Sequence, residues 1–99
     1  MAQFDLYAGV GRTNGYVVDV QADLLDLLAT RVVAPLKSKA EAQIITGLMP
    51  VVEFEGAEFV VLIQEMAAVQ TRELQRRAGS LAGYQDNIKR ALDILFFGI

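Results

Sequence analysis

The feature that most constrains the fold of this chain is a change in the spacing of its apolar residues near Tyr84. Before Tyr84, short apolar segments with strand-like patterns are separated by glycine-containing turns. After it, apolar residues recur at helical spacing to the end of the chain. The pattern predicts a mainly β fold with a C-terminal helix, as a small barrel or a curled antiparallel sheet. A length of 99 residues fits a single domain covering 1–99.

Turn residues divide the first part of the chain into separate strands. Asn14-Gly15 indicates a hairpin, and Glu55-Gly56 indicates a second tight turn. Pro35 predicts that its segment lies on an edge of the sheet or ends there. We expect a connector over 37–47 and a linker between Gly79 and Gly83. The segments expected as strands are Gln3–Tyr7, Tyr16–Val20, Thr30–Leu36, Leu48–Phe54, Ala57–Ile63 and Met66–Thr71.

Composition argues against several classes of function. The net charge of −3 disfavours a protein that grips nucleic acid through its phosphates. Histidine is absent, which removes the commonest general base and metal ligand, and cysteine is absent, which removes disulfides and thiolate metal sites. The apolar runs are too short to cross a bilayer, and the N-terminus lacks a signal-peptide pattern. We therefore expect a cytoplasmic protein without a cofactor.

The C-terminal helix carries one aromatic residue on its polar face. At about 100° per residue, an apolar stripe forms around Tyr84, and Phe97 falls on the opposite side of the helix. Either the helix frays at Phe96 and the last residues fold back into the core, or Phe97 is an exposed aromatic anchor of the kind enriched at binding hot spots. The apolar stripe contains Ile88, Ala91, Leu92, Leu95 and Ile99, and the polar face contains Asp86, Lys89, Arg90 and Asp93.

A second apolar concentration lies in the segment before the third expected strand. It contains Leu24, Leu25, Leu27 and Leu28. Four leucines in five residues exceed what one face of a short turn can bury. Either all four reach the core from an irregular segment, or one pair is left for another surface, such as an interface between two copies of the chain.

Several ordered motifs resemble those of the CcdB toxin family, and the resemblance spans nearly the whole chain. The motifs are Gln3-Phe4-x-x-Tyr7, Tyr16-x-Val-Asp-Val-Gln-Ala-Asp-Leu-Leu-Asp26, Arg31-x-Val-x-Pro-Leu36, Met49-Pro-Val-Val52, Met66-Ala-Ala-Val69 and Asn87-Ile-Lys-Arg-Ala-Leu-Asp-Ile-Leu-Phe-Phe-Gly-Ile99. The Val-Asp-Val-Gln-x-Asp block and the Gly-Ile terminus are the most specific of these.

The resemblance implies a homodimeric toxin of a type II toxin–antitoxin module, built on an SH3-like barrel with a small extra antiparallel sheet. Such toxins are not enzymes. They bind the A subunit of DNA gyrase and trap the cleaved gyrase–DNA complex. A CcdA-type antitoxin neutralises the toxin, and the two together repress their operon, so that the toxin meets operator DNA only through the antitoxin.

The resemblance also implies a set of gyrase-binding residues. The family's terminal Trp-Gly-Ile falls on Phe97, Gly98 and Ile99, and phenylalanine makes a weaker cation–π contact than tryptophan. The family's asparagine one turn earlier falls on Asp93, which adds negative charge towards an arginine-bearing partner. The remaining implied contacts are Phe96, Leu24, Leu25 and Phe4.

Two alternatives stay open from the sequence. MazF-like ribonucleases share the SH3-like barrel, and Arg12 and Arg31 near Asp19 form a weak constellation for RNA cleavage. The chain is otherwise an inactive family member that dimerises without poisoning gyrase, an interpretation that Phe97 in place of tryptophan keeps open.

Overall fold

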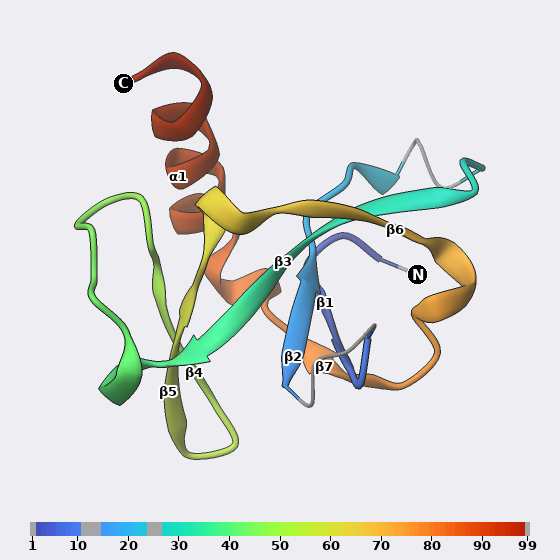
Figure 1. The fold of residues 1–99 in the computed structure, drawn as a ribbon, viewed down its shortest axis with the longest axis horizontal. Coiled ribbons are helices and arrows are strands. Elements are labelled where there is room, and N and C mark those ends of the chain that lie inside the picture. The colour runs from blue at the N-terminus through green and yellow to red at the C-terminus, as the bar shows by residue number, and fades with distance from the viewer. Residues whose placement is uncertain (1, 11–14, 24–26, 99) are drawn as a thin grey trace.

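The computed structural model describes residues 2–10, 15–23 and 27–98, which form one curled antiparallel sheet and a C-terminal helix (Figure 1). The mainly β fold with a C-terminal helix is therefore confirmed. The strands are β1 (Asp5–Ala8), β2 (Tyr16–Asp19), β3 (Thr30–Ser38), β4 (Val51–Phe54), β5 (Ala57–Val61), β6 (Ala67–Gln70) and β7 (Arg77–Ser80). The helix is α1 (Gln85–Phe97), and short 3₁₀ turns are η2 (Lys39–Glu41), η3 (Ile63–Glu65), η4 (Thr71–Glu73) and η5 (Ala82–Tyr84).

The two turns predicted from glycine pairs connect antiparallel strands. β1 pairs with β2, as the Asn14-Gly15 signal predicted, although Asn14 itself lies outside the described residues. β4 and β5 pair up to Phe54 and Ala57, which leaves Glu55-Gly56 as a two-residue turn. Both turn residues have positive φ, at 51° and 79°. Positive φ at both positions is the requirement of the type I′ hairpin turn.

β3 is the central strand of the sheet, which contradicts the edge position predicted from Pro35. The sheet order is β4-β5-β3-β2-β1-β7, and β6 also pairs with β3. On one side of β3, residues 30–33 pair with β6 and residues 36–38 pair with β5. Pro35 lies in the gap between these pairings, and its carbonyl accepts a 2.9 Å hydrogen bond from the Leu62 N–H. The missing N–H of Pro35 therefore costs no ladder bond on that side.

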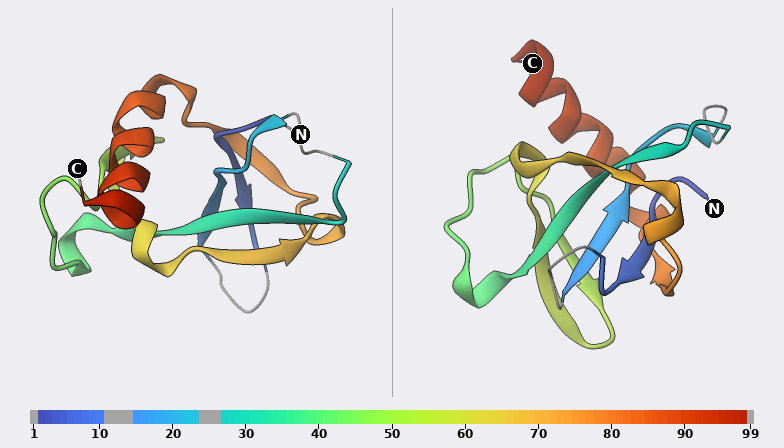
Figure 2. Two further views of the ribbon diagram at one scale, coloured as in Figure 1. Left: turned by 90° about the horizontal axis from the view of Figure 1, so that it is seen from above. Right: turned by 45° about the vertical axis from the view of Figure 1, so that its right-hand side comes forward.

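The sheet curls until its first and last strands touch. A Cβ atom at Gly79 in β7 would lie 2.5 Å from Cε1 of Phe54 in β4. The expected linker between Gly79 and Gly83 is thus partly wrong, because Arg77–Ser80 is a strand that pairs with β1. Figure 2 shows β3 running across the molecule and the sheet bending around it. β4, β5 and the end of β3 form the smaller sheet of the curl.

Side chains on both faces of the central strands are buried. Leu6 and Val18 lie in the main core with Ile88 and Ala91 of α1. The next residues along the strands, such as Tyr7, point to the opposite face, where Val10, Val17, Val33 and Leu74 form a second cluster. This alternation is the period of two that a strand imposes. The helix covers one face of the sheet, and the segment containing η4 covers part of the other.

Candidate partner-binding surface

The last turn of α1 carries exposed apolar side chains. Ile88 and Ala91 are fully buried against the sheet, but Leu95, Phe96 and Phe97 are 37%, 63% and 75% exposed. The helix continues to Phe97 without fraying at Phe96, so the interpretation in which the phenylalanines fold back into the core is wrong. Figure 1 shows the C-terminal turns of α1 extending beyond the sheet, which explains why the apolar stripe loses its cover at Leu95.

Gly98 ends the helix in the left-handed conformation. Its φ is 75°, and its N–H donates a 3.0 Å hydrogen bond to the Ile94 carbonyl. A glycine at this position adopts positive φ without the steric cost of a Cβ. No atom lies within 4 Å of where a Cβ of Gly98 would be. Gly98 therefore terminates the helix while leaving the surface beside Phe97 uncovered. Ile99 lies outside the described residues.

The polar face of α1 lies where the helical spacing predicted it. Asp86, Lys89, Arg90 and Asp93 are exposed. Within the described part of the chain, the ion pairs involve none of these four. Asp93 is thus an exposed charge in the penultimate turn, on the same side of the helix as Phe97.

A loop adds two more apolar side chains near the end of α1. Ile44 and Ile45 are 41% and 55% exposed. The loop reaches the helix at Gly47, where an added Cβ would lie 3.1 Å from Cδ1 of Ile94. The sequence analysis missed this pair, although two isoleucines in an otherwise polar connector were a usable signal. We call Ile44, Ile45, Leu95, Phe96 and Phe97 the tip surface.

Phe4 is not at the surface, unlike the other implied contact residues that the structure describes. It is 3% exposed and belongs to the main core. Its N–H donates to the Asp19 carbonyl at 2.6 Å, and its carbonyl accepts from the Leu81 N–H at 2.7 Å. These bonds hold its backbone at φ 72° with the ring turned inward. Phe4 therefore supports the fold in this conformation and presents no side chain to a partner.

The leucine segment lies apart from the tip surface. Leu27 and Leu28 are 96% and 51% exposed, so the interpretation in which all four leucines reach the core is wrong. Leu24 and Leu25 lie outside the described residues. The segment joins the start of β3, which pairs with the end of β6, whereas α1 packs beside η3 at the start of β6. Figures 1 and 2 place the two regions at opposite ends of β6.

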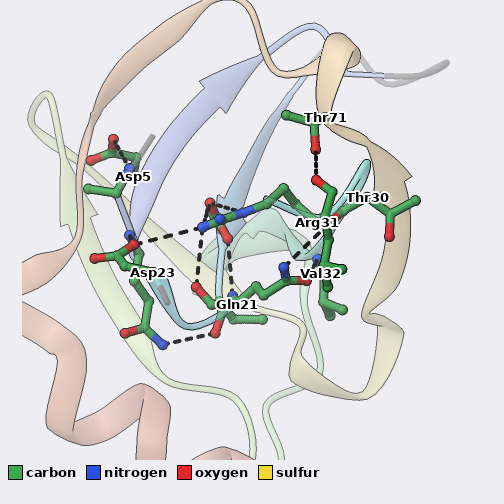
Figure 3. A network of polar contacts seen from close by, with 12 residues as sticks. Asp5, Gln21, Asp23, Thr30, Arg31, Val32 and Thr71 are labelled. Carbon is green, nitrogen blue, oxygen red and sulfur yellow. Dashed lines mark hydrogen bonds and ion pairs between the residues drawn. The ribbon is translucent and has the colours of Figure 1, made fainter. Parts of the chain in front are cut away.

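A buried ion pair occupies the place where the sequence allowed a ribonuclease site. Arg31 and Asp19 are both fully buried, and the Asp19 carboxylate accepts bonds of 2.9 and 2.6 Å from Nε and Nη2 of Arg31 (Figure 3). Burial raises the pKa of Asp19 above its ordinary value, and the hydrogen bond from Arg31 opposes that shift. Since the Arg31 guanidinium has no exposed surface, it is not available to an RNA phosphate. Arg12, the other arginine of that constellation, lies outside the described residues.

Other kinds of site find no support in the described ranges. Those residues include no group of three or more acidic side chains that could hold a metal ion. None of the helices there has the length and apolar character that crossing a bilayer requires. The hollow beside the leucine segment, with a volume of about 480 Å³, is lined by Ala29, Thr30, Gln70, Thr71 and Arg72.

The fold defines the class of protein to which this chain belongs. It matches the fold of a toxin–antitoxin toxin, in a solved structure described as an endoribonuclease in complex with its cognate antitoxin from a mycobacterial species. The TM-score is 0.74 at 12% sequence identity, and the match covers 94% of this chain and 91% of the other. At that identity the likeness shows the fold alone. The profile of the CcdB protein family matches residues 3–98, and the chain is a member of the CcdB family of toxins.

Proposed function

We propose that this protein binds the A subunit of DNA gyrase through the tip surface and traps the cleaved gyrase–DNA complex. The observation that carries the proposal is the exposure of Phe96 and Phe97 at 63% and 75% on an ordered helix. Exposed aromatic side chains on a rigid element make effective binding anchors because little entropy is lost when they are buried. Binding that favours one state of an enzyme's cycle raises the population of that state, so the mechanism requires no catalytic residue here.

Charge at the helix end supports the same partner. Asp93 is exposed on the polar face that Phe97 shares, one turn before it. An arginine on the partner would meet both a carboxylate and an aromatic ring at this position, through an ion pair and a cation–π contact. Phe97, Gly98, Ile99, Phe96 and Asp93 are the proposed contacts on the helix, with Leu24 and Leu25 as proposed contacts from the leucine segment.

We further propose that the toxin acts as a homodimer. β6 pairs only with β3 among the described strands, and its outer edge has no strand beside it. Ala67 and Ala68 in β6 are exposed, so a second copy can approach this edge closely. Unprotected edges of this kind favour pairing with another chain. A two-fold dimer would present two tip surfaces to a two-fold target such as the gyrase A dimer.

The proposal includes a CcdA-type antitoxin as the second partner. The similar mycobacterial structure was solved with its cognate antitoxin, which supports the presence of such a partner here. In this proposal the toxin works in the cytoplasm and reaches operator DNA only as a co-repressor with the antitoxin. The net charge of −3 is consistent with the absence of direct DNA contact by the toxin alone.

A plasmid-cleavage assay tests the proposal. The protein is incubated with gyrase of its own host, ATP and supercoiled plasmid, and the mixture is then treated with detergent and protease. Accumulation of linear DNA is expected. If no linear DNA appears, the poison mechanism is wrong. Cleavage of RNA in a reaction without gyrase would favour the ribonuclease alternative, although the burial of Arg31 opposes that outcome.

A further inference from the structure

The Val-Asp-Val-Gln-x-Asp block, one of the most specific motifs in the sequence, holds no exposed binding residue of its own. It occupies the end of β2 and the residues that follow, up to Asp23. Its three polar side chains, Asp19, Gln21 and Asp23, all form contacts around Arg31 (Figure 3). The chain leaves the sheet after this block and returns as β3 at Thr30. The contacts made by the block therefore concern how the chain leaves and re-enters the sheet.

Gln21 continues the hydrogen-bond ladder after the main chain has departed. The Val20 N–H donates to the Val32 carbonyl at 3.0 Å, which is the last backbone bond between the two segments on this side. Beyond it, the Gln21 side-chain amide accepts from the Val32 N–H at 3.1 Å and donates to the Thr30 carbonyl at 3.4 Å. A side-chain amide thus replaces a peptide group, which leaves the backbone free to turn away without stranding polar groups of β3.

Asp23 holds the beginning of the excursion. Its Oδ1 accepts a 2.6 Å hydrogen bond from the Gln3 N–H and lies 3.8 Å from Nη2 of Arg31. The same Nη2 donates to the Asp19 carboxylate at 2.6 Å and to the Gln21 carbonyl at 3.2 Å. The entry of the excursion is therefore attached both to the N-terminal segment and to the buried ion pair.

Thr71 in η4 holds the end of the excursion from a distant part of the sequence. Its hydroxyl donates a 3.2 Å hydrogen bond to the Leu28 carbonyl, and its N–H donates a 2.8 Å bond to the Ala29 carbonyl. One residue thus fixes two successive carbonyls just before β3 begins. Figure 3 shows Thr71 approaching from a different part of the chain than Gln21 and Asp23.

We propose that Gln21, Asp23 and Thr71 are positioning residues that hold both ends of the leucine segment, so that its exposed side chains meet the partner in a fixed conformation. Fixing a binding segment before association reduces the entropy lost on binding. The inference rests on the proposed function in one respect, since it takes DNA gyrase as the partner that contacts this segment. These residues act through the segment and do not themselves touch the partner.

Two threonine variants of the full-length protein test the proposal. Thr71→Val removes the hydroxyl that holds the Leu28 carbonyl, and Thr71→Ser restores a hydroxyl. Thr30→Val is the matched control, because the Thr30 hydroxyl forms no hydrogen bond among the described residues although Thr30 lines the same hollow. Amide exchange of a peptide covering residues 22–29 should be about fivefold faster in Thr71→Val, the value for one hydrogen bond of ~1 kcal/mol, and normal in the other two variants.

Binding to the isolated gyrase A dimer gives the second readout. The dissociation constant should rise about fivefold in Thr71→Val at an unchanged unfolding temperature, and return to normal in Thr71→Ser. Asp23→Ala should give the same pattern from the other end of the segment. Equal exchange rates in Thr71→Val and Thr30→Val would overturn the proposal, as would faster exchange without weaker binding. If the wild-type protein does not bind gyrase, the proposed function fails, while the exchange comparison still decides whether Thr71 holds the segment.

Discussion

Gly47 and Ile94 are in direct contact, and this contact joins the two parts of the tip surface. A Cβ at position 47 would lie 3.1 Å from Cδ1 of Ile94, and Gly47 adopts a φ of 85°. The residues beside Gly47 include the exposed Ile44 and Ile45, and Ile94 precedes the exposed end of α1. A side chain at position 47 would therefore both strain the backbone and push the loop away from the helix.

Gly47→Ala should destabilise the protein more than a matched change at Gly56. Both glycines have positive φ, but no atom lies within 4 Å of where the Cβ of Gly56 would be. We expect Gly56→Ala to lower the free energy of unfolding by about 1–2 kcal/mol through backbone strain alone. Gly47→Ala should cost about 2–4 kcal/mol because crowding against Ile94 is added. Urea denaturation measures both, and equal losses would show that the Ile94 contact contributes nothing.

Gly79→Ala should open the curl of the sheet. The added Cβ would lie 2.5 Å from the Phe54 ring, which is itself held by an edge-on contact with Tyr16 at a centroid distance of 5.3 Å. We expect a loss of about 1–3 kcal/mol in the free energy of unfolding. Gly83→Ala is the control, since Gly83 has open space around it and no positive φ. A Gly79→Ala protein as stable as the control would contradict the close approach of β4 and β7.

Asp19→Asn should be among the most destabilising conservative changes in the chain. It leaves the fully buried Arg31 guanidinium without a carboxylate partner, which costs about 3–5 kcal/mol in comparable sites. The double variant Asp19→Leu/Arg31→Met should recover most of that loss, because neither charge then remains buried. Glu58→Gln, which breaks the exposed pair with Lys39, should change stability by less than about 1 kcal/mol. A double variant no more stable than Asp19→Asn would contradict this account.

Local signals in the sequence predicted the elements whose cause is local. Glu55-Gly56 forms its hairpin because both residues adopt positive φ, and α1 follows the helical spacing from Gln85 to Phe97. The position of Pro35 was predicted wrongly because a proline avoids ladder positions in general, and the sequence did not reveal a gap between two partner strands on the same side of β3. β7 was missed because it pairs with β1, more than 70 residues away, around a glycine that looks like a linker residue.

The candidate site was predictable in part for the same reason. The exposure of Phe97 follows from its angle on the helix, which can be read from spacing alone. Ile44 and Ile45 join the tip surface only because Gly47 meets Ile94 in three dimensions. The burial of Phe4 depends on backbone bonds to Asp19 and Leu81, which no local pattern indicates.

Phe97→Ala should leave the fold intact while weakening partner binding. Phe97 is 75% exposed, so its removal should change the free energy of unfolding by no more than about 0.5 kcal/mol. Loss of a central aromatic anchor should cost at least about 2 kcal/mol of binding, which corresponds to a roughly 30-fold rise in the dissociation constant for the gyrase A dimer. Isothermal titration measures binding, and thermal unfolding checks the fold. A large fall in unfolding temperature would show that Phe97 belongs to the core.

The most direct test of the tip surface as the gyrase-binding site compares DNA cleavage by host gyrase in the presence of wild type, Phe97→Ala and Lys89→Ala. Lys89 is exposed on the same helix and serves as the matched control. The account predicts linear DNA at similar concentrations of wild type and Lys89→Ala, and a requirement for roughly 30-fold more of Phe97→Ala. Linear DNA formed equally well by Phe97→Ala, or by none of the three proteins, would contradict it.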